Sequence, residues 1–134
     1  MRLISVAVSL VLLAGCASTG TVTINQAEFE VYLADEPAEH ELGLGNITNL
    51  ESDQGMLFLF QDSQPHTFWM KDVEYPIDII WINNDKVVGS VTAYPGPGTY
   101  ESPQSVDTVL EVPAETAAIQ QIEVGDNVVV DEYW

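Results

Sequence analysis

Short runs of alternating apolar and polar residues constrain the fold of this chain more than any other feature. A period of two is typical of half-buried β-strands, because successive side chains point to opposite faces of a sheet. Clusters of Asn, Asp, Gly and Pro separate the runs, so each predicted strand is short. Strands are expected at residues 22–24, 29–33, 56–60, 67–71, 77–82, 86–93, 106–112 and 128–130.

Two short helices interrupt the predicted strands. Asp35 can cap a first helix over residues 35–42, which has Pro37 in its first turn and ends at Gly43. Pro113 is expected to open a second helix over residues 114–122, and the proline-rich segment 95–104 is predicted to be irregular. The fold class is therefore mainly β, as an antiparallel sandwich or a jelly-roll-like barrel with two short helices.

The N-terminus carries the pattern of an export signal. Arg2 precedes an apolar run over residues 3–13, which is too short to span a bilayer as a helix. The run leads into Leu13-Ala14-Gly15-Cys16, which resembles a bacterial lipobox and contains the single cysteine of the chain. The resemblance implies that Cys16 is lipidated and becomes the new N-terminus. The alternative is an ordinary secreted protein that is cut near Ala17 and loses Cys16.

These observations predict three segments. Residues 1–15 are expected to be a signal peptide, residues 16–21 a lipidated tether, and residues 22–134 a single β-rich domain. The predicted location is the outer side of the cytoplasmic membrane, on a periplasmic or extracellular face, with the membrane bound through the lipid on Cys16. We expect the domain to be a monomer.

The charge balance is strongly acidic. All 21 acidic residues follow Cys16, against Lys71 and Lys86, so the chain after the signal carries a charge of −19. Such a surface repels nucleic acid and anionic headgroups. High salt screens the self-repulsion, so we interpret the composition as a halophilic adaptation. A calcium-binding surface is the competing interpretation, although no EF-hand loop is present. No metal or other cofactor is predicted.

The central segments resemble a known family. Gly43-Leu44, Gly55-Met56-Leu57-Phe58, Phe68-Trp69-Met70-Lys71 and Pro76-Ile77-Asp78-Ile79 are similar to the signature of the domain of unknown function 192, also called uncharacterised protein family 0127. Tyr100-Glu101-Ser102, the run from Val109 to Ala114, and Gly125-Asp126 are similar to its second half. The resemblance spans residues 28–131 and implies a compact β-rich domain in a family whose members often carry export signals. It implies no reaction.

The chain departs from this family pattern in two places. Family members usually have a basic residue before the Gly-Leu pair, where Glu41 and Leu42 stand here. Many have cysteines near the segment of Pro95, where this chain has none. A function that depends on those groups elsewhere would be carried out differently here, or not at all.

Lys71 and Asp78 are the first candidates for chemistry. Lys71 is one of two lysines after the signal, and it can bind an anionic group or act as a base. Asp78 shares the predicted face of Ile80 and Ile82, where a carboxylate needs a cation or hydrogen bonds. The two residues are therefore interpreted as a buried structural pair or as parts of a binding site. Asp78 can alternatively cap the backbone of the turn that precedes it, or act as an acid of raised pKa.

Trp69, Tyr100 and Ser102 complete the candidate binding site. Alternation on a strand places Trp69 opposite Met70, so that one packs in the core and the other lines a pocket. Tyr100 and Ser102 belong to the proline-rich loop, and loops on rigid sheets often carry function. Glu111 faces away from Leu110 and Val112, and we expect it on a solvated edge.

The two histidines are not predicted to form a metal site, because His40 and His66 are far apart in sequence and no second His or Cys lies at ligand spacing. His66 is expected to cap the strand that follows Pro65. No catalytic residue is predicted.

The predicted function is a lipid-anchored extracytoplasmic binding or accessory module for a small polar ligand, held around Lys71, Trp69, Asp78, Tyr100 and Ser102. One alternative is a structural or interaction protein of an envelope complex, which would show an exposed apolar patch and no deep pocket. The other is an enzyme in which Lys71 and Asp78 converge as an acid/base pair.

Overall fold

The computed structural model describes residues 18–133, and the predicted lipobox therefore lies outside the described residues. The strands and helices follow one another as β1 (Thr19–Ile24), β2 (Ala27–Ala34), α1 (Pro37–Leu42), a 3₁₀ turn (Gly43–Asn46), β3 (Gln54–Gln64), β4 (Thr67–Trp69), β5 (Ile77–Asn83), β6 (Lys86–Ala93), β7 (Thr99–Glu101), β8 (Val106–Pro113), α2 (Thr116–Ile119) and β9 (Val128–Tyr133).

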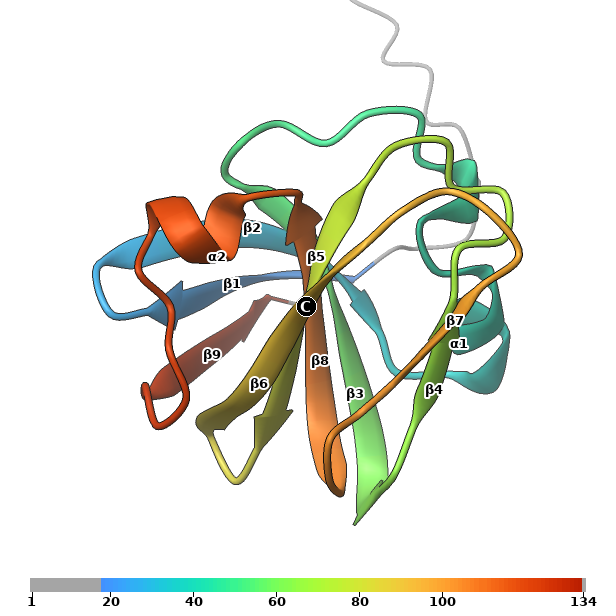
Figure 1. The fold of residues 1–134 in the computed structure, drawn as a ribbon. Helices are drawn as coiled ribbons and strands as arrows, with labels where there is room; N and C mark the ends of the chain where they lie inside the picture. The colour runs from blue at the N-terminus through green and yellow to red at the C-terminus, as the bar shows by residue number, and fades with distance from the viewer. Residues whose placement is uncertain (1–17, 134) are drawn as a thin grey trace, which may run out of the picture.

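One seven-stranded sheet forms most of the domain, in the order β6-β5-β8-β3-β2-β1-β9. Neighbours are antiparallel except for β2 and β3, which run parallel. The sheet curls, and its edges approach at an antiparallel bridge between Lys86 and Asn127 (Figure 1). β4 and β7 form a separate two-stranded sheet. The prediction of a mainly β fold with two short helices is confirmed, as a half-barrel.

Apolar side chains pack on both faces of the large sheet. Along β5, Ile80 and Ile82 join a cluster that also contains Phe29 of β2 and Leu110 of β8. The alternate residues Ile77, Ile79 and Trp81 join a second cluster on the opposite face. Burial on both faces explains why β5 is continuously apolar from Ile77 to Ile82, apart from Asp78. We call these the first and the second cluster.

The two-stranded sheet and α1 cover the second cluster. Phe68 of β4 and Tyr100 of β7 pack against it, and Phe58 of β3 lies within it. Helix α2 contributes instead to the first cluster, through Ala117. The second cluster is therefore an additional layer outside the half-barrel.

Two predictions about the first half of the domain differ from the structure. Residues 19–21, predicted as tether, are the first half of β1, because they pair with both β2 and β9. Helix α1 starts after Glu36 and not after Asp35, because the Glu39 carboxylate accepts hydrogen bonds from both backbone amides, at 3.0 Å each. These contacts lower the pKa of Glu39.

Two predictions in the second half also differ. Thr99–Glu101 form β7 within the segment predicted to be irregular, because they pair with β4. The second helix spans only Thr116–Ile119. Pro113 closes β8, where it pairs with Ile77, and Glu115 has a left-handed backbone with φ of 72° that prevents an earlier start.

Within residues 18–133, no helix is both long enough and apolar enough to cross a membrane.

Candidate functional site

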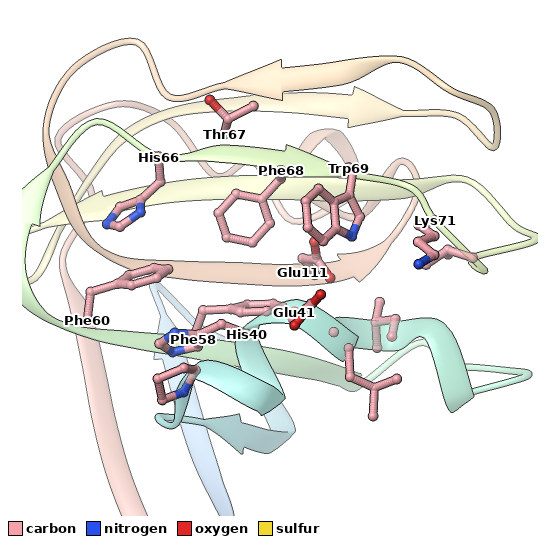
Figure 2. A pocket seen from close by; sticks show the side chains of 15 residues that line it. His40, Glu41, Phe58, Phe60, His66, Thr67, Phe68, Trp69, Lys71 and Glu111 are labelled. Carbon is pink, nitrogen blue, oxygen red and sulfur yellow. The ribbon is translucent and has the colours of Figure 1, made fainter.

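A cavity of about 370 Å³ opens between α1 and β4, over the second cluster (Figure 2). Helix α1 and the 3₁₀ turn form one wall, residues 66–71 form the other, and β3 and β8 contribute from below. We call it the α1–β4 pocket. Its polar lining side chains are those of His40, Glu41, His66, Thr67, Lys71 and Glu111.

Aromatic rings make up much of the pocket wall. Phe58 and Phe68 meet edge to face, with ring centroids 5.0 Å apart, and Phe68 makes a similar contact with Trp81 at 5.5 Å. These contacts fix the rings in the favoured T-shaped geometry. Trp69 lies at the mouth and remains 48% exposed, whereas Met70 is buried in the second cluster. The predicted division between Trp69 and Met70 is confirmed, with Trp69 on the pocket side.

Two histidines flank Phe60 at one end of the pocket. His66 stacks on Phe60 at 3.7 Å, and His40 lies 4.6 Å from the same ring. Nε2 of His40 lies 2.9 Å from the Ala34 carbonyl and 3.0 Å from the Leu59 carbonyl. Since both neighbours are acceptors, Nε2 carries the proton.

His66 does not have the capping role that the sequence predicted. Its Nε2 is buried without a hydrogen-bond partner among the described residues. Burial lowers the pKa of His66, and the charge of His40 lowers it further. His66 is therefore neutral at pH 7. Among residues 18–133, no group of three or more His, Cys, Asp or Glu side chains is arranged to hold a metal ion.

Glu111 was expected on a solvated edge, and that expectation is wrong. Its side chain is only 4% exposed, because its face of β8 is covered by the second cluster. Its neighbours across the sheet are Met56 and Ile79. Within residues 18–133 its carboxyl group has no hydrogen-bond partner. Burial raises the pKa of Glu111 to about 8, so the group is predominantly protonated at pH 7.

Lys71 lines the pocket at the end away from His66, as Figure 2 shows. Its side chain is exposed, and it makes no hydrogen bond or ion pair with the described part of the chain. A flexible ammonium beside a wall of rings can bind an anionic group.

Asp78 lies elsewhere, on the face of the first cluster. It is 3% exposed, and it accepts hydrogen bonds from Thr92 Oγ1 at 2.8 Å and from the backbone amide of Ala117 at 2.9 Å. The carboxyl group thus holds the start of α2 against β5 and β6.

Lys71 lines a pocket above the second cluster, on the other face of the sheet. The predicted pair of Lys71 and Asp78 is therefore not formed.

Tyr100 and Ser102 support the pocket from behind without lining it. The Ser102 hydroxyl accepts a hydrogen bond from the His66 amide at 3.0 Å, and the Ser102 amide donates to the His66 carbonyl at 2.9 Å. The Tyr100 hydroxyl accepts from the Tyr94 amide at 3.0 Å. Of the five predicted binding residues, the structure brings Trp69 and Lys71 into the pocket. Tyr100 and Ser102 lie beside the pocket wall, and Asp78 lies on the other face of the sheet.

Sequence reasoning missed Glu111 and the two histidines as pocket residues. A signal for Glu111 was present, because a carboxylate inside the apolar run Val109-Leu110-Glu111-Val112 is unusual for a strand buried on both faces. The histidines gave no such signal, since α1 and β4 are brought together only by the fold.

A comparison with protein families identifies the relatives of this chain. Residues 20–130 match the model of DUF192, whose description reads "Uncharacterized ACR". The chain belongs to the DUF192 family. The resemblance seen in the sequence is thereby confirmed, while the lipoprotein assignment is not part of that match. No curated protein matches the chain significantly.

Two solved structures share the fold of this DUF192 domain. A protein from Sinorhizobium meliloti 1021, described as a candidate transcription regulator, is 26% identical, with a TM-score of 0.81 over 87% of this chain and 96% of its own. A protein of unknown function from Novosphingobium aromaticivorans DSM 12444 is 28% identical, with a TM-score of 0.76 over 88% of this chain and 89% of its own. Both cover nearly the whole described domain.

Proposed function

We propose that this DUF192 domain is a binding module whose α1–β4 pocket holds a small ligand with an apolar ring and an anionic group. One observation carries the proposal: a cavity walled by Phe58, Phe60, Phe68 and Trp69 has Lys71 at one end, and this lysine has no partner within residues 18–133. Aromatic walls with a few placed polar groups are typical of ligand sites. The rings would hold the apolar part, and Lys71 would pair with the anion.

The pocket favours a ligand-binding function over the two alternatives. An accessory of an envelope complex was expected to lack a deep pocket, and two of the exposed large apolar residues, Leu42 and Trp69, border the pocket itself. The enzyme alternative required Lys71 and Asp78 to converge, and they lie on opposite faces of the sheet. A nucleic-acid role, suggested by the description of the Sinorhizobium protein, is disfavoured by 21 acidic residues against two lysines after Cys16.

A titration with 3-phenylpropanoate, a ring with one carboxylate, tests the proposal. Isothermal calorimetry at pH 7 should detect binding, and Lys71→Met should weaken it about tenfold or more, since a charged contact contributes about 1.5–3 kcal/mol. Lys86→Met is the matched control, because Lys86 donates to Asn127 at 2.7 Å and does not line the pocket. Equal affinities of the Lys71 and Lys86 variants would count against the proposal. Native mass spectrometry of the purified domain would show a ligand retained from the cell.

The proposal also places the domain at a membrane, through lipidation of Cys16. Because β1 begins at Thr19, only residues 17 and 18 separate the lipidated residue from the sheet. Two extended residues span less than about 10 Å, so the domain would lie close to the bilayer. This distance is shorter than the tether first expected from the sequence.

Cys16→Ser should release the protein from membranes, or leave it as an uncleaved precursor. Two or three acyl chains anchor a protein stably, whereas none remain in this variant. Membrane fractionation and mass measurement of the N-terminus would show the change. A processed protein that stays in the membrane fraction without Cys16 would rule out the lipobox.

A further inference from the structure

Glu111 is a feature of the α1–β4 pocket that neither the packing of the domain nor Lys71 explains. A buried carboxyl group without a hydrogen-bond partner costs free energy, because it has lost its contacts with water. Glu111 is 4% exposed, has no partner among residues 18–133, and lines the cavity. Figure 2 shows its side chain among those that line the pocket. A group with these properties is suited to a partner that arrives from outside.

We infer that Glu111 determines the specificity of this pocket by donating a hydrogen bond from its carboxyl group to an oxygen of the ligand's anionic group, which makes oxyanions the ligand class, with a carboxylate as the simplest member. This inference rests on the proposed function and names the group that the ligand must present. A protonated carboxyl has one donor, and a carboxylate is a strong acceptor for it, because charge-assisted O–H···O⁻ bonds are short and strong. Lys71 would supply the balancing charge.

The surroundings of Glu111 favour the protonated form. Its strand neighbours Met56 and Ile79 are apolar, and burial raises its pKa to about 8. Tyr75, which donates to the Ile47 carbonyl at 2.9 Å, has a raised pKa through burial and the charge of Glu111, and therefore also stays neutral. The remaining titratable side chains around the pocket are His40, His66, Glu41 and Lys71.

The proton on Glu111 makes binding depend on pH in a defined direction. With a pKa of about 8, the protonated fraction falls from about 0.9 at pH 7 to about 0.1 at pH 9. If only this form binds, the apparent Kd rises in inverse proportion to the fraction, or about tenfold. His66 does not contribute to this change, because its lowered pKa leaves it neutral throughout the range.

The test measures 3-phenylpropanoate binding at pH 7, 8 and 9 in wild type, Glu111→Gln, Glu111→Leu and Glu28→Gln. Glu111→Gln retains a donor and cannot ionise, so its affinity should match wild type at pH 7 and stay constant to pH 9. Glu111→Leu should bind at least tenfold more weakly at pH 7. Glu28→Gln removes an exposed carboxylate of β2 and should retain the pH dependence of wild type.

The test distinguishes a failure of the role inferred for Glu111 from a failure of the proposed ligand-binding function. If wild type binds the probe and Lys71→Met does not, the proposed function holds. A constant affinity of wild type from pH 7 to 9 would then overturn the role of Glu111, as would equal binding by Glu111→Leu. Tighter binding at pH 9 than at pH 7 would also overturn the inference, because the protonated form of Glu111 would then not be the form that binds the anion. If wild type does not bind the probe at all, both fail.

Discussion

Glu111→Gln should stabilise the unliganded domain at pH 8 by several kcal/mol while changing its stability little at pH 5. Burial raises the pKa of Glu111 from 4.5 to about 8 in the folded protein, whereas the unfolded chain keeps the ordinary value. Between these two values the folded state holds a proton that the unfolded state has released. The contribution of Glu111 to stability is therefore fully present below pH 4.5 and is lost as pH rises through about 8.

The full loss of this contribution to the free energy of unfolding corresponds to about 5 kcal/mol, since each tenfold change in proton affinity equals about 1.4 kcal/mol. Gln fills nearly the same space and cannot ionise, so its stability lacks this dependence. Urea unfolding at pH 5, 6.5 and 8, at one salt concentration, measures the difference between the variant and wild type. Constant salt matters because the other acidic groups also titrate and repel one another.

Glu28→Gln provides the comparison for this experiment. Glu28 is exposed on β2, and its replacement should change stability little and equally at the three pH values. If the difference in the free energy of unfolding between Glu111→Gln and wild type did not grow from pH 5 to pH 8, the assignment of Glu111 as buried and protonated would be wrong.

Asp78→Ala should cost about 3 kcal/mol or more in the free energy of unfolding. The substitution removes the acceptor of two hydrogen bonds, and it leaves Thr92 Oγ1 and the Ala117 amide without their partner. Since the Ala117 amide lies in the first turn of the four-residue helix α2, we expect this helix to lose its attachment to β5. Thermal or chemical unfolding at pH 7 measures the loss.

Two double-mutant cycles distinguish this account from a pairing of Asp78 with Lys71. Asp78→Ala with Thr92→Val should show coupling of about 0.5–3 kcal/mol, because the two side chains share a hydrogen bond. Asp78→Ala with Lys71→Met should show none, and Lys71→Met alone should be nearly neutral. Coupling between Asp78 and Lys71 of more than about 1 kcal/mol would contradict the separation of these residues across the sheet.

Local sequence patterns predicted the strands well, because their signals come from adjacent residues. The alternation of Phe29, Val31 and Leu33 with exposed Glu28 and Glu30 corresponds to the observed burial of β2. The run from Ile77 to Ile82 is β5 with one further residue. The helices were less accurate, since the backbone of Glu115 and the pairing of Pro113 depend on contacts with distant strands.

The pocket was predicted only in part, because its walls are distant in the sequence. Lys71 was identified because it is one of only two lysines after Cys16, and Trp69 because alternation along a strand places it opposite Met70. Glu111 was placed on the correct side of β8, but the layer that covers that side is formed by β4 and β7, whose pairing was not predicted. Asp78 was recognised as unusual, and its actual partners, Thr92 and Ala117, lie 14 and 39 residues further along the chain.

The position of β8 has a consequence for how the domain acquires its fold. β8 lies in the sheet between β5 and β3, although both precede it in the chain. The β1–β2 and β5–β6 hairpins can form locally, but no strand joins them until residues 106–113 are available. Such non-local pairing is slow to form. A chain exported as proposed could therefore not complete its large sheet until residues 106–113 had left the translocation channel.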